Sequence, residues 1–179
     1  MAINYLKKYN ALLELNHFTE WERKQSLEAI FNRDIADNVD FKFKTKIIRP
    51  LKKEDVYDVS SLFKHLTFRT EDVTDKRGVK IKTRAIFDFE RSKRLHWILP
   101  HINEKVKEEI RLFSSVVRIK GRDITRTFIH NVTENYIVIL EPQRSGLDYY
   151  LITAYYLEKK LGGPKSINKI YNRRLKEVY

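Results

Sequence analysis

The chain of 179 residues contains no cysteine, only five glycines and only four prolines. Without cysteine it has no disulfide, no thiolate zinc ligand and no cysteine nucleophile, so its stability must come from packing. The scarcity of glycine and proline leaves little room for long linkers or low-complexity segments. We therefore expect one folded domain of ordinary size, with or without a small helical appendage.

Apolar segments long enough to cross a membrane are also missing. Lysines interrupt the apolar pattern at the N-terminus, "MAINYLKKYNALLEL", which excludes the core of a signal peptide. We therefore expect no membrane association and a cytoplasmic location, either in the producing cell or after delivery into a target cell.

Several catalytic signatures are absent as well. The sequence has no glycine-rich phosphate loop, no GxSxG elbow and no cluster of paired acids at a strand end, which disfavours ATP-driven and acyl-transfer chemistry. None of its histidines falls into HExxH or another paired metal-ligand spacing; they are His17, His65, His96, His101 and His130. We expect neither a metal centre nor a cofactor.

Basic residues outnumber acidic ones. The chain has 36 lysines and arginines against 24 aspartates and glutamates, a formal net charge of +12. Such an excess favours polyanionic partners, nucleic acid first, through electrostatic steering and counterion release. The alternative is a basic surface that only keeps the protein dispersed.

Apolar spacing predicts helices in the first half of the chain. Two N-terminal helices are indicated within residues 1–38, and "TEWE", Thr19 to Glu22, is a capping-box pattern. Alternating phenylalanine and lysine predict a half-exposed strand over residues 40–48, with Lys42, Lys44 and Lys46 outward. The following segments predict a helix over 53–66, a hairpin of 68–73 with 79–87, a helix from Phe89 ended near Leu99 by Pro100, and a helix over 103–113.

The last third of the chain predicts a meander. Its strands are expected at residues 116–120, 124–132, 136–141 and 149–157, followed by an amphipathic basic helix after "GGPKS". The predicted fold is α+β, an antiparallel sheet of about four strands packed against helices. Residues 1–38 form an α-helical N-terminal extension and residues 39–179 the main domain.

Two of the predicted strands carry polar side chains suited to RNA. The pleat places Arg126 and His130 on one face of their strand, and Thr153 and Tyr155 share a face with Leu151 on another. Cationic donors, hydroxyls and an aromatic ring suit single-stranded RNA. They also supply what metal-free RNA cleavage needs: a base for the 2′-hydroxyl, positive charge at the phosphorane and a proton for the leaving oxygen.

Three segments together resemble a known family: "FDFERSKRLHWILPHI", "RTFIHNVTENYIVILEPQRSGLDYYLITAYYLEKK" and "NRRLKEVY". Their order and spacing are similar to the phage-associated branch of the barnase/EndoU/colicin/RelE-like (BECR) nucleases, clearest over residues 84–179. The positions that match polar motif residues of the family are Arg91, Arg94, Trp97, Arg126, Thr153 and Tyr155. His130 departs from an expected aromatic residue, and "FKHLTF" is similar to a family element that brings His65 forward, although the expected glycine is absent.

The resemblance implies a metal-independent endoribonuclease, or a toxin-like relative, that cleaves RNA through a 2′,3′-cyclic phosphate. It implies tRNA or mRNA as target and an immunity protein or antitoxin as partner of a monomer or dimer. The expected catalytic residues are Arg126, His130, Thr153, Tyr155 and His65. The expected substrate-binding residues are Arg91, Arg94, Lys120, Arg144, Lys159, Arg173 and Arg174. The alternative is a nucleic-acid-binding or partner-binding protein of a phage or mobile element that uses the same fold without catalysis.

Each candidate also has a structural interpretation. Thr153 fits an ordinary strand position, Arg126 could pair with Glu141 across the sheet, and His65 could be a cation at a helix C-terminus. Trp97 fits a core position. The exposed lysines and arginines fit solvated faces that contact a nucleic-acid backbone without reading its sequence.

Overall fold

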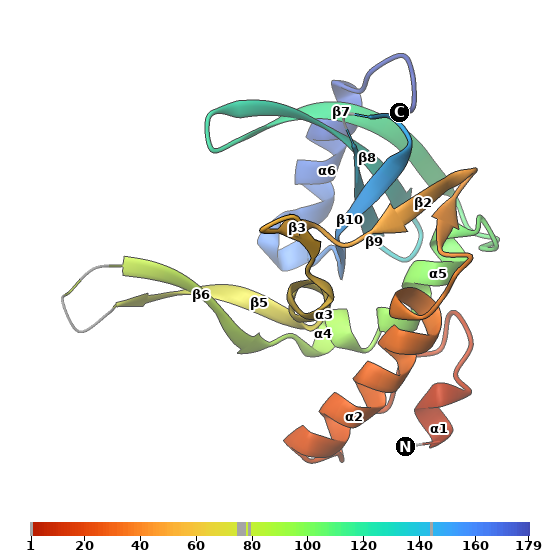
Figure 1. Cartoon of the computed structure of the whole chain (residues 1–179), viewed down its shortest axis with the longest axis vertical. Helices are drawn as coiled ribbons and strands as arrows, with labels where there is room; N and C mark the ends of the chain where they lie inside the picture. Colours follow the sequence, from red (N-terminus) through yellow and green to blue (C-terminus); the bar gives the residue numbers. More distant parts are fainter. Residues whose placement is uncertain (1, 75–77, 79, 144) are drawn as a thin grey trace.

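The computed structural model describes residues 2–74, 78, 80–143 and 145–179 (Figure 1). Its helical segments are α1 (Ala2–Tyr5), α2 (Glu20–Phe31), η1 (Asn32–Ala36), α3 (Val59–Thr67), α4 (Phe89–Ser92), η2 (Leu95–Trp97), α5 (Ile98–Ile102), η3 (Lys159–Leu161) and α6 (Gly163–Asn172). Its strands are β1 (Lys42–Phe43), β2 (Lys46–Arg49), β3 (Lys52–Lys53), β4 (Val56–Tyr57), β5 (Phe68–Thr74), β6 (Lys80–Phe87), β7 (Ile110–Ile119), β8 (Arg122–Asn131), β9 (Tyr136–Pro142) and β10 (Asp148–Tyr156). The α+β class predicted from the sequence is confirmed.

The central sheet has six strands in the order β1-β2-β10-β9-β8-β7, and it is mixed. The predicted antiparallel meander forms its β7–β10 half. The prediction of an antiparallel sheet of about four strands was wrong, because residues 40–48, predicted as one strand, form β1 and β2, and both join the sheet. Lys44 adopts a positive φ of 54°, which turns the chain into the β1–β2 hairpin, and β2 then pairs with β10 in parallel.

Apolar side chains cover both faces of the sheet. One face, with Val138 and Leu140, joins a buried cluster that includes Leu27 and Ile30 of α2 and Trp97. The other face packs against α6 through a second cluster: Phe113, Phe128, Ile137, Ile139, Ile152, Leu157 and Ile167. In Figure 1, α5 and α6 lie on opposite sides of strands β8–β10. The sheet is therefore buried on both sides, which explains the apolar runs along β9.

Strand β10 is paired along only part of one edge, and its alternation of faces is interrupted. Strand β2 pairs only with Asp148, Tyr149 and Tyr150, and a register irregularity follows between Leu151 and Thr153. Leu151 packs into the cluster that contains Leu140, whereas Thr153 pairs with Ile139 of the second cluster. The expectation that Leu151 shares a face with Thr153 and Tyr155 was therefore wrong, because a bulge resets the alternation. Beyond Tyr150, the edge of β10 that faces away from β9 has no strand beside it among the described residues, and helices α3 and α4 pack against β10 there.

Three predicted helices differ in the structure. The helix over residues 103–113 was wrong: β7 begins at Ile110, and Leu112 and Phe113 pack into different clusters, the period of a strand. The helix from Phe89 breaks into α4, η2 and α5, and Pro100 lies within α5, where a first turn tolerates it. The tail helix is α6. It begins at Gly163, within "GGPKS" and not after it, and it ends at Asn172.

Two other local predictions were confirmed, and one helix begins later than predicted. Thr19 and Glu22 form the predicted capping box at the start of α2. The β5–β6 hairpin forms, although most of its predicted "DKRG" turn lies outside the described residues. Helix α3 begins at Val59, later than predicted, because the β3–β4 hairpin precedes it. No helix within the described ranges is long and apolar enough to cross a membrane.

The packing of α2 predicts how the N-terminal segment contributes to stability. Ile30 is 0% exposed and belongs to the same cluster as Trp97 and Leu140, so Ile30→Ala should lower the free energy of unfolding by about 2–5 kcal/mol. Trp21 lies on the same helix but is 63% exposed, so Trp21→Ala should change it by less than about 0.5 kcal/mol. Urea denaturation followed by circular dichroism measures both variants. A main transition that is unchanged in Ile30→Ala would show that residues 1–38 fold separately.

Candidate functional site

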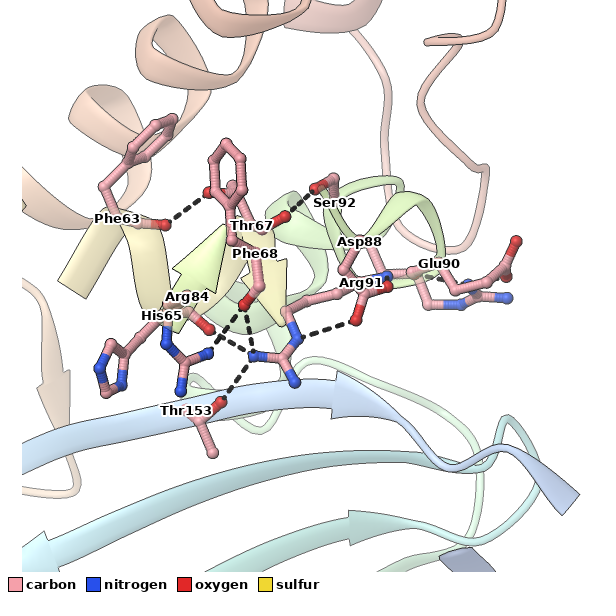
Figure 2. Close-up of polar contacts among 11 residues, drawn as sticks. Phe63, His65, Thr67, Phe68, Arg84, Asp88, Glu90, Arg91, Ser92 and Thr153 are labelled. Atoms are coloured by element: carbon pink, nitrogen blue, oxygen red, sulfur yellow. Dashed lines mark hydrogen bonds and ion pairs between the residues drawn. The ribbon is translucent and has the colours of Figure 1, made fainter. Parts of the chain in front are cut away.

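The open edge of β10 meets α3, α4 and the start of the β5–β6 hairpin, and four polar side chains gather there (Figure 2). They come from four segments: His65 from the last turn of α3, Arg84 from β6, Arg91 from α4 and Thr153 from β10. Figure 2 shows the side chains of His65, Arg84 and Arg91 in a row above β10, with Thr153 facing them. We call these four residues the arginine cluster.

Local hydrogen bonds hold α3 and α4 in this arrangement. Asp88 caps α4 by accepting a hydrogen bond from the Arg91 backbone N–H at 3.0 Å. The Asp88 backbone N–H and the Ser92 hydroxyl both donate to the carbonyl oxygen of Thr67, at 2.9 Å and 3.1 Å. The start of α4 is therefore fixed against the end of α3, and Arg91 must extend towards β10.

Arg91 is the centre of the arginine cluster. Its Nη1 donates to the carbonyl oxygen of His65 and lies 3.5 Å from both the Phe68 carbonyl oxygen and the Thr153 hydroxyl. Its guanidinium carbon lies 5.4 Å from the centre of the Tyr155 ring, a cation–π contact. Burial lowers the pKa of Arg91, and the Asp88 carboxylate, 3.6 Å away, opposes this. Buried Nε has no hydrogen-bond partner among the described residues.

Arg84 places a second guanidinium beside the first. Its Nη1 donates to the Phe68 carbonyl oxygen at 2.8 Å, the oxygen that Arg91 also approaches. Burial and then the charge of Arg91 lower the pKa of Arg84. Within the described ranges no carboxylate forms an ion pair with Arg84. The two guanidinium groups carry two positive charges, and the one carboxylate nearby, that of Asp88, balances only one of them. The remaining positive charge favours the binding of an anion.

His65 stands next to both guanidinium groups. Burial lowers its pKa most, Arg84 and Arg91 lower it further, and the backbone of Ile152 acts in the opposite direction. The imidazole is therefore neutral at pH 7 and can accept a proton. The sequence placed His65 at a helix C-terminus, where a cation is favoured. In the tertiary structure, burial and then the charges of Arg84 and Arg91 disfavour the protonated imidazole and outweigh that preference.

Tyr155 contacts Arg91 through its ring and packs against the second apolar cluster. Burial raises the pKa of its hydroxyl, and the charges of Arg91 and Arg126 lower it. The phenol thus remains protonated at neutral pH and can donate a hydrogen bond. The structure therefore brings together three of the five predicted catalytic residues, which are His65, Thr153 and Tyr155, with Arg91 from the predicted binding set.

Arg126 and His130 are placed differently. Arg126 forms an ion pair with Glu141 across the sheet at 3.4 Å, so a carboxylate already balances its charge. His130 is 3% exposed, and the charges that act on it are those of Arg111 and Glu109 on the β7 side. The structure does not bring His130 to His65.

The remaining predicted binding residues are spread over the surface or buried. Arg94 is buried, pairs with Glu90 at 2.8 Å and stacks on Trp97 and Tyr156, so it is structural in character. Trp97 is a core residue, 2% exposed. The exposed cations among them are Lys120 in the turn between β7 and β8, Lys159 at the start of η3, and Arg173 and Arg174 directly after α6. Arg144 lies outside the described residues.

Sequence reasoning missed Arg84 and Asp88. Arg84 follows a run of alternating lysines in a predicted strand, and nothing in its spacing separates it from Lys82. Asp88 directly precedes a predicted helix, where aspartate is a common N-cap, so its capping role was visible. The sequence did not show that Asp88 also pairs with Arg91.

No group of three or more histidine, aspartate or glutamate side chains in the described parts of the chain could hold a metal ion. The chemistry available at the arginine cluster is that of cations, a neutral imidazole and hydroxyls. No protein-family model, no curated protein and no solved structure matches this chain.

Burial of His130 predicts a loss of stability in acid. Burial and Arg111 lower its pKa to about 4, and Glu109 opposes them. Because the unfolded chain binds this proton near pH 6.5, the free energy of unfolding should fall as pH decreases from about 6.5 to about 4. His130→Gln should remove on the order of 2 kcal/mol of this pH dependence. Urea denaturation at several pH values tests it, with the exposed His17→Gln as control; equal slopes in His130→Gln and the unmodified protein would contradict it.

Proposed function

We propose that this protein is a metal-independent endoribonuclease whose active centre is the arginine cluster. The observation that carries the proposal is the pair of guanidinium groups of Arg84 and Arg91 around one carbonyl, beside the neutral imidazole of His65. A phosphodiester that enters this position meets two cations of fixed geometry and a base. Arginine suits this task because its planar fork can bind two phosphate oxygens at once.

Each residue has a defined step in the proposed reaction. His65 accepts the proton of the ribose 2′-hydroxyl, whose oxygen then bonds to phosphorus. Arg84 and Arg91 stabilise the charge that develops on the phosphorane oxygens, and the Thr153 hydroxyl donates a hydrogen bond to one of them. The bond from phosphorus to the 5′-oxygen breaks, and that oxygen takes a proton from the Tyr155 hydroxyl or from water. The products are a 2′,3′-cyclic phosphate and a 5′-hydroxyl.

RNA is favoured as substrate because this route requires a 2′-hydroxyl. The net charge of +12 supports association with a long polyanion. The matched positions of the BECR resemblance also support the proposal, since Arg91, Thr153 and Tyr155 meet in space although 62 residues separate Arg91 from Thr153. We place the activity in the cytoplasm, where tRNA and mRNA are available, and a toxin-like enzyme of this kind needs an immunity protein or antitoxin.

A second candidate function is RNA binding without cleavage. It is favoured by the ion pair of Arg126 with Glu141 and by the burial of His130, because two expected catalytic residues are engaged elsewhere. This candidate predicts tight, salt-sensitive binding with no turnover.

Substitution of the arginine cluster tests the enzyme proposal. The protein should cleave RNA in EDTA and leave 2′,3′-cyclic phosphate ends. Arg91→Ala should lower the cleavage rate by at least about 100-fold, and Thr153→Ala by about tenfold, because each removes a hydrogen bond made to the transition state. Lys120→Ala, an exposed cation on a β-turn, is the control and should lower the rate less than about threefold.

Folding of each variant is checked by circular dichroism before the assay, since Arg91 also contacts the end of α3. Retained folding with unchanged cleavage in both Arg91→Ala and Thr153→Ala would disprove the proposed active centre. Binding of RNA without any cleavage by the unmodified protein would favour the second candidate.

The pH dependence of cleavage tests the role of His65. Because burial, and then the charges of Arg84 and Arg91, lower the pKa of His65, the rate should rise with pH through an apparent pKa below 6.5. Arg84→Gln should lower the rate and also move this acid limb to higher pH, since one of the charges that disfavour the imidazolium is gone. A lower rate with an unmoved acid limb would contradict general-base catalysis by His65.

A further inference from the structure

The segment after β10 is the longest part of the chain without a carboxylate side chain. Residues 159–176 contain no aspartate or glutamate, and the nearest acidic residues along the sequence are Glu158 and Glu177. The segment has seven cations, which are Lys159, Lys160, Lys165, Lys169, Arg173, Arg174 and Lys176. Among the described residues, none of the seven forms an ion pair with a carboxylate. Uncompensated charges of one sign on a single segment favour a polyanionic partner.

Helix α6 arranges three of these cations in a row. Lys165, Lys169 and the C-cap residue Arg173 follow one another at intervals of four residues, and residues four apart lie on one face of a helix about 6 Å from each other. All three are exposed, whereas Ile167 on the opposite face is buried in the second apolar cluster. The three cations therefore face away from the sheet into solvent, and we call them the α6 ridge.

At the far end of α6, an aromatic ring holds two more guanidinium groups. The guanidinium carbons of Arg111 and Arg174 lie 5.0 Å and 4.3 Å from the centre of the Tyr171 ring. Arg111 also pairs with Glu109 at 3.2 Å, so a carboxylate balances its charge. Arg174 donates from Nη1 to the Tyr171 carbonyl oxygen at 3.2 Å. A guanidinium that is already held in place loses little conformational freedom when it binds two phosphate oxygens.

The near end of α6 lies beside the arginine cluster. Gly163, its first residue, lines the same cavity of about 220 Å³ as Arg91. The other charged residues of that wall are Arg69, Asp88, Glu90 and Glu158, and two of these carboxylates already pair, Asp88 with Arg91 and Glu90 with Arg94.

From this cavity α6 runs along the sheet towards β7 (Figure 1). The α6 ridge extends from Lys165 to Arg173, about 12 Å at a rise of about 1.5 Å per residue. A strand of RNA with stacked bases about 3.4 Å apart places roughly four nucleotides over this length. A strand that leaves the arginine cluster at Gly163 therefore meets the row of cations.

We propose that the α6 ridge and Arg174 bind the phosphates of the RNA strand that flanks the scissile bond on one side. The inference rests on the proposed function and specifies its substrate as a strand that extends at least about four nucleotides beyond the cleaved phosphate. These contacts position the strand without reading its sequence. A dinucleotide reaches the arginine cluster but not the α6 ridge.

Binding of RNA that cannot be cleaved provides the first test. A labelled 2′-O-methyl strand of about 12 nucleotides lacks the hydroxyl that the proposed reaction needs, and fluorescence anisotropy measures its affinity. The combined variant Lys165→Gln, Lys169→Gln and Arg173→Gln should raise Kd at least about tenfold. It should also make log Kd less steeply dependent on log salt concentration, by about 2 in the slope, because each contact to a single strand contributes about 0.7.

The combined variant Lys24→Gln, Lys105→Gln and Lys107→Gln is the matched control. It removes the same charge from exposed positions, and Lys105 and Lys107 lie beside α5, on the opposite side of strands β8–β10 from α6 (Figure 1). Its Kd should rise less than about threefold. An equal rise in both variants would show that only net charge matters and would overturn the proposal. Polyglutamate that binds the protein at least as tightly as RNA would overturn it in favour of an acidic protein as partner.

Substrate length provides a second test, which separates the α6 ridge from the arginine cluster. With a long RNA, the ridge variant should lower kcat/KM at least about tenfold and change kcat less than about threefold, because contacts to the flanking strand are equal in the bound substrate and the transition state. With a dinucleotide, the ridge variant and the unmodified protein should cleave equally fast. An equal loss with the dinucleotide would overturn the proposal and leave the nuclease intact. RNA binding that depends on the ridge, without any cleavage, would support the ridge and reject the proposed nuclease.

Discussion

The buried guanidinium of Arg91 is the interaction on which the candidate site depends. A partly desolvated cation needs acceptors, and the end of α3 provides them through the carbonyl oxygens of His65 and Phe68. The His65 carbonyl lies in the last turn of α3, where a helix leaves its carbonyls without an intrahelical partner, and the helix dipole favours a cation there. The Phe68 carbonyl belongs to the first residue of β5. One contact therefore satisfies the end of α3, fixes the position of α4 and brings a positive charge to the edge of β10.

The edge of β10 is available for this purpose because of how the sheet is paired. The pairing of β2 with β10 ends at Tyr150 of β10. The bulge that follows in β10 sends Leu151 and Thr153 to opposite faces of the sheet. A regular strand covered by β2 along its full length would have left no space for α3 and α4. The mixed sheet, which the sequence pattern did not predict, is thus part of the reason that a polar site exists at this place.

Local signals predicted the fold where neighbouring residues decide it. The capping box of Thr19 and Glu22, the β5–β6 hairpin and the β7–β10 meander depend on contacts that are near in sequence, and all were predicted. The errors fall where distant partners decide. Residues 103–113 satisfy a helical period and a strand period in part, and pairing with β8 selects the strand at Ile110. Lys44 turns the chain because β2 finds its partner in β10, about 100 residues later along the sequence.

The amino-acid sequence alone determined the chemical inventory of this protein: an excess of cations, no cysteine, and the residues His65, Arg91, Thr153 and Tyr155 as candidates. Tertiary structure decided which of them act together. It added Arg84, paired Arg126 with Glu141 and buried His130 away from His65. The physical reason is that pKa values and ion pairs depend on distances between side chains, and these follow from long-range packing that no local pattern encodes.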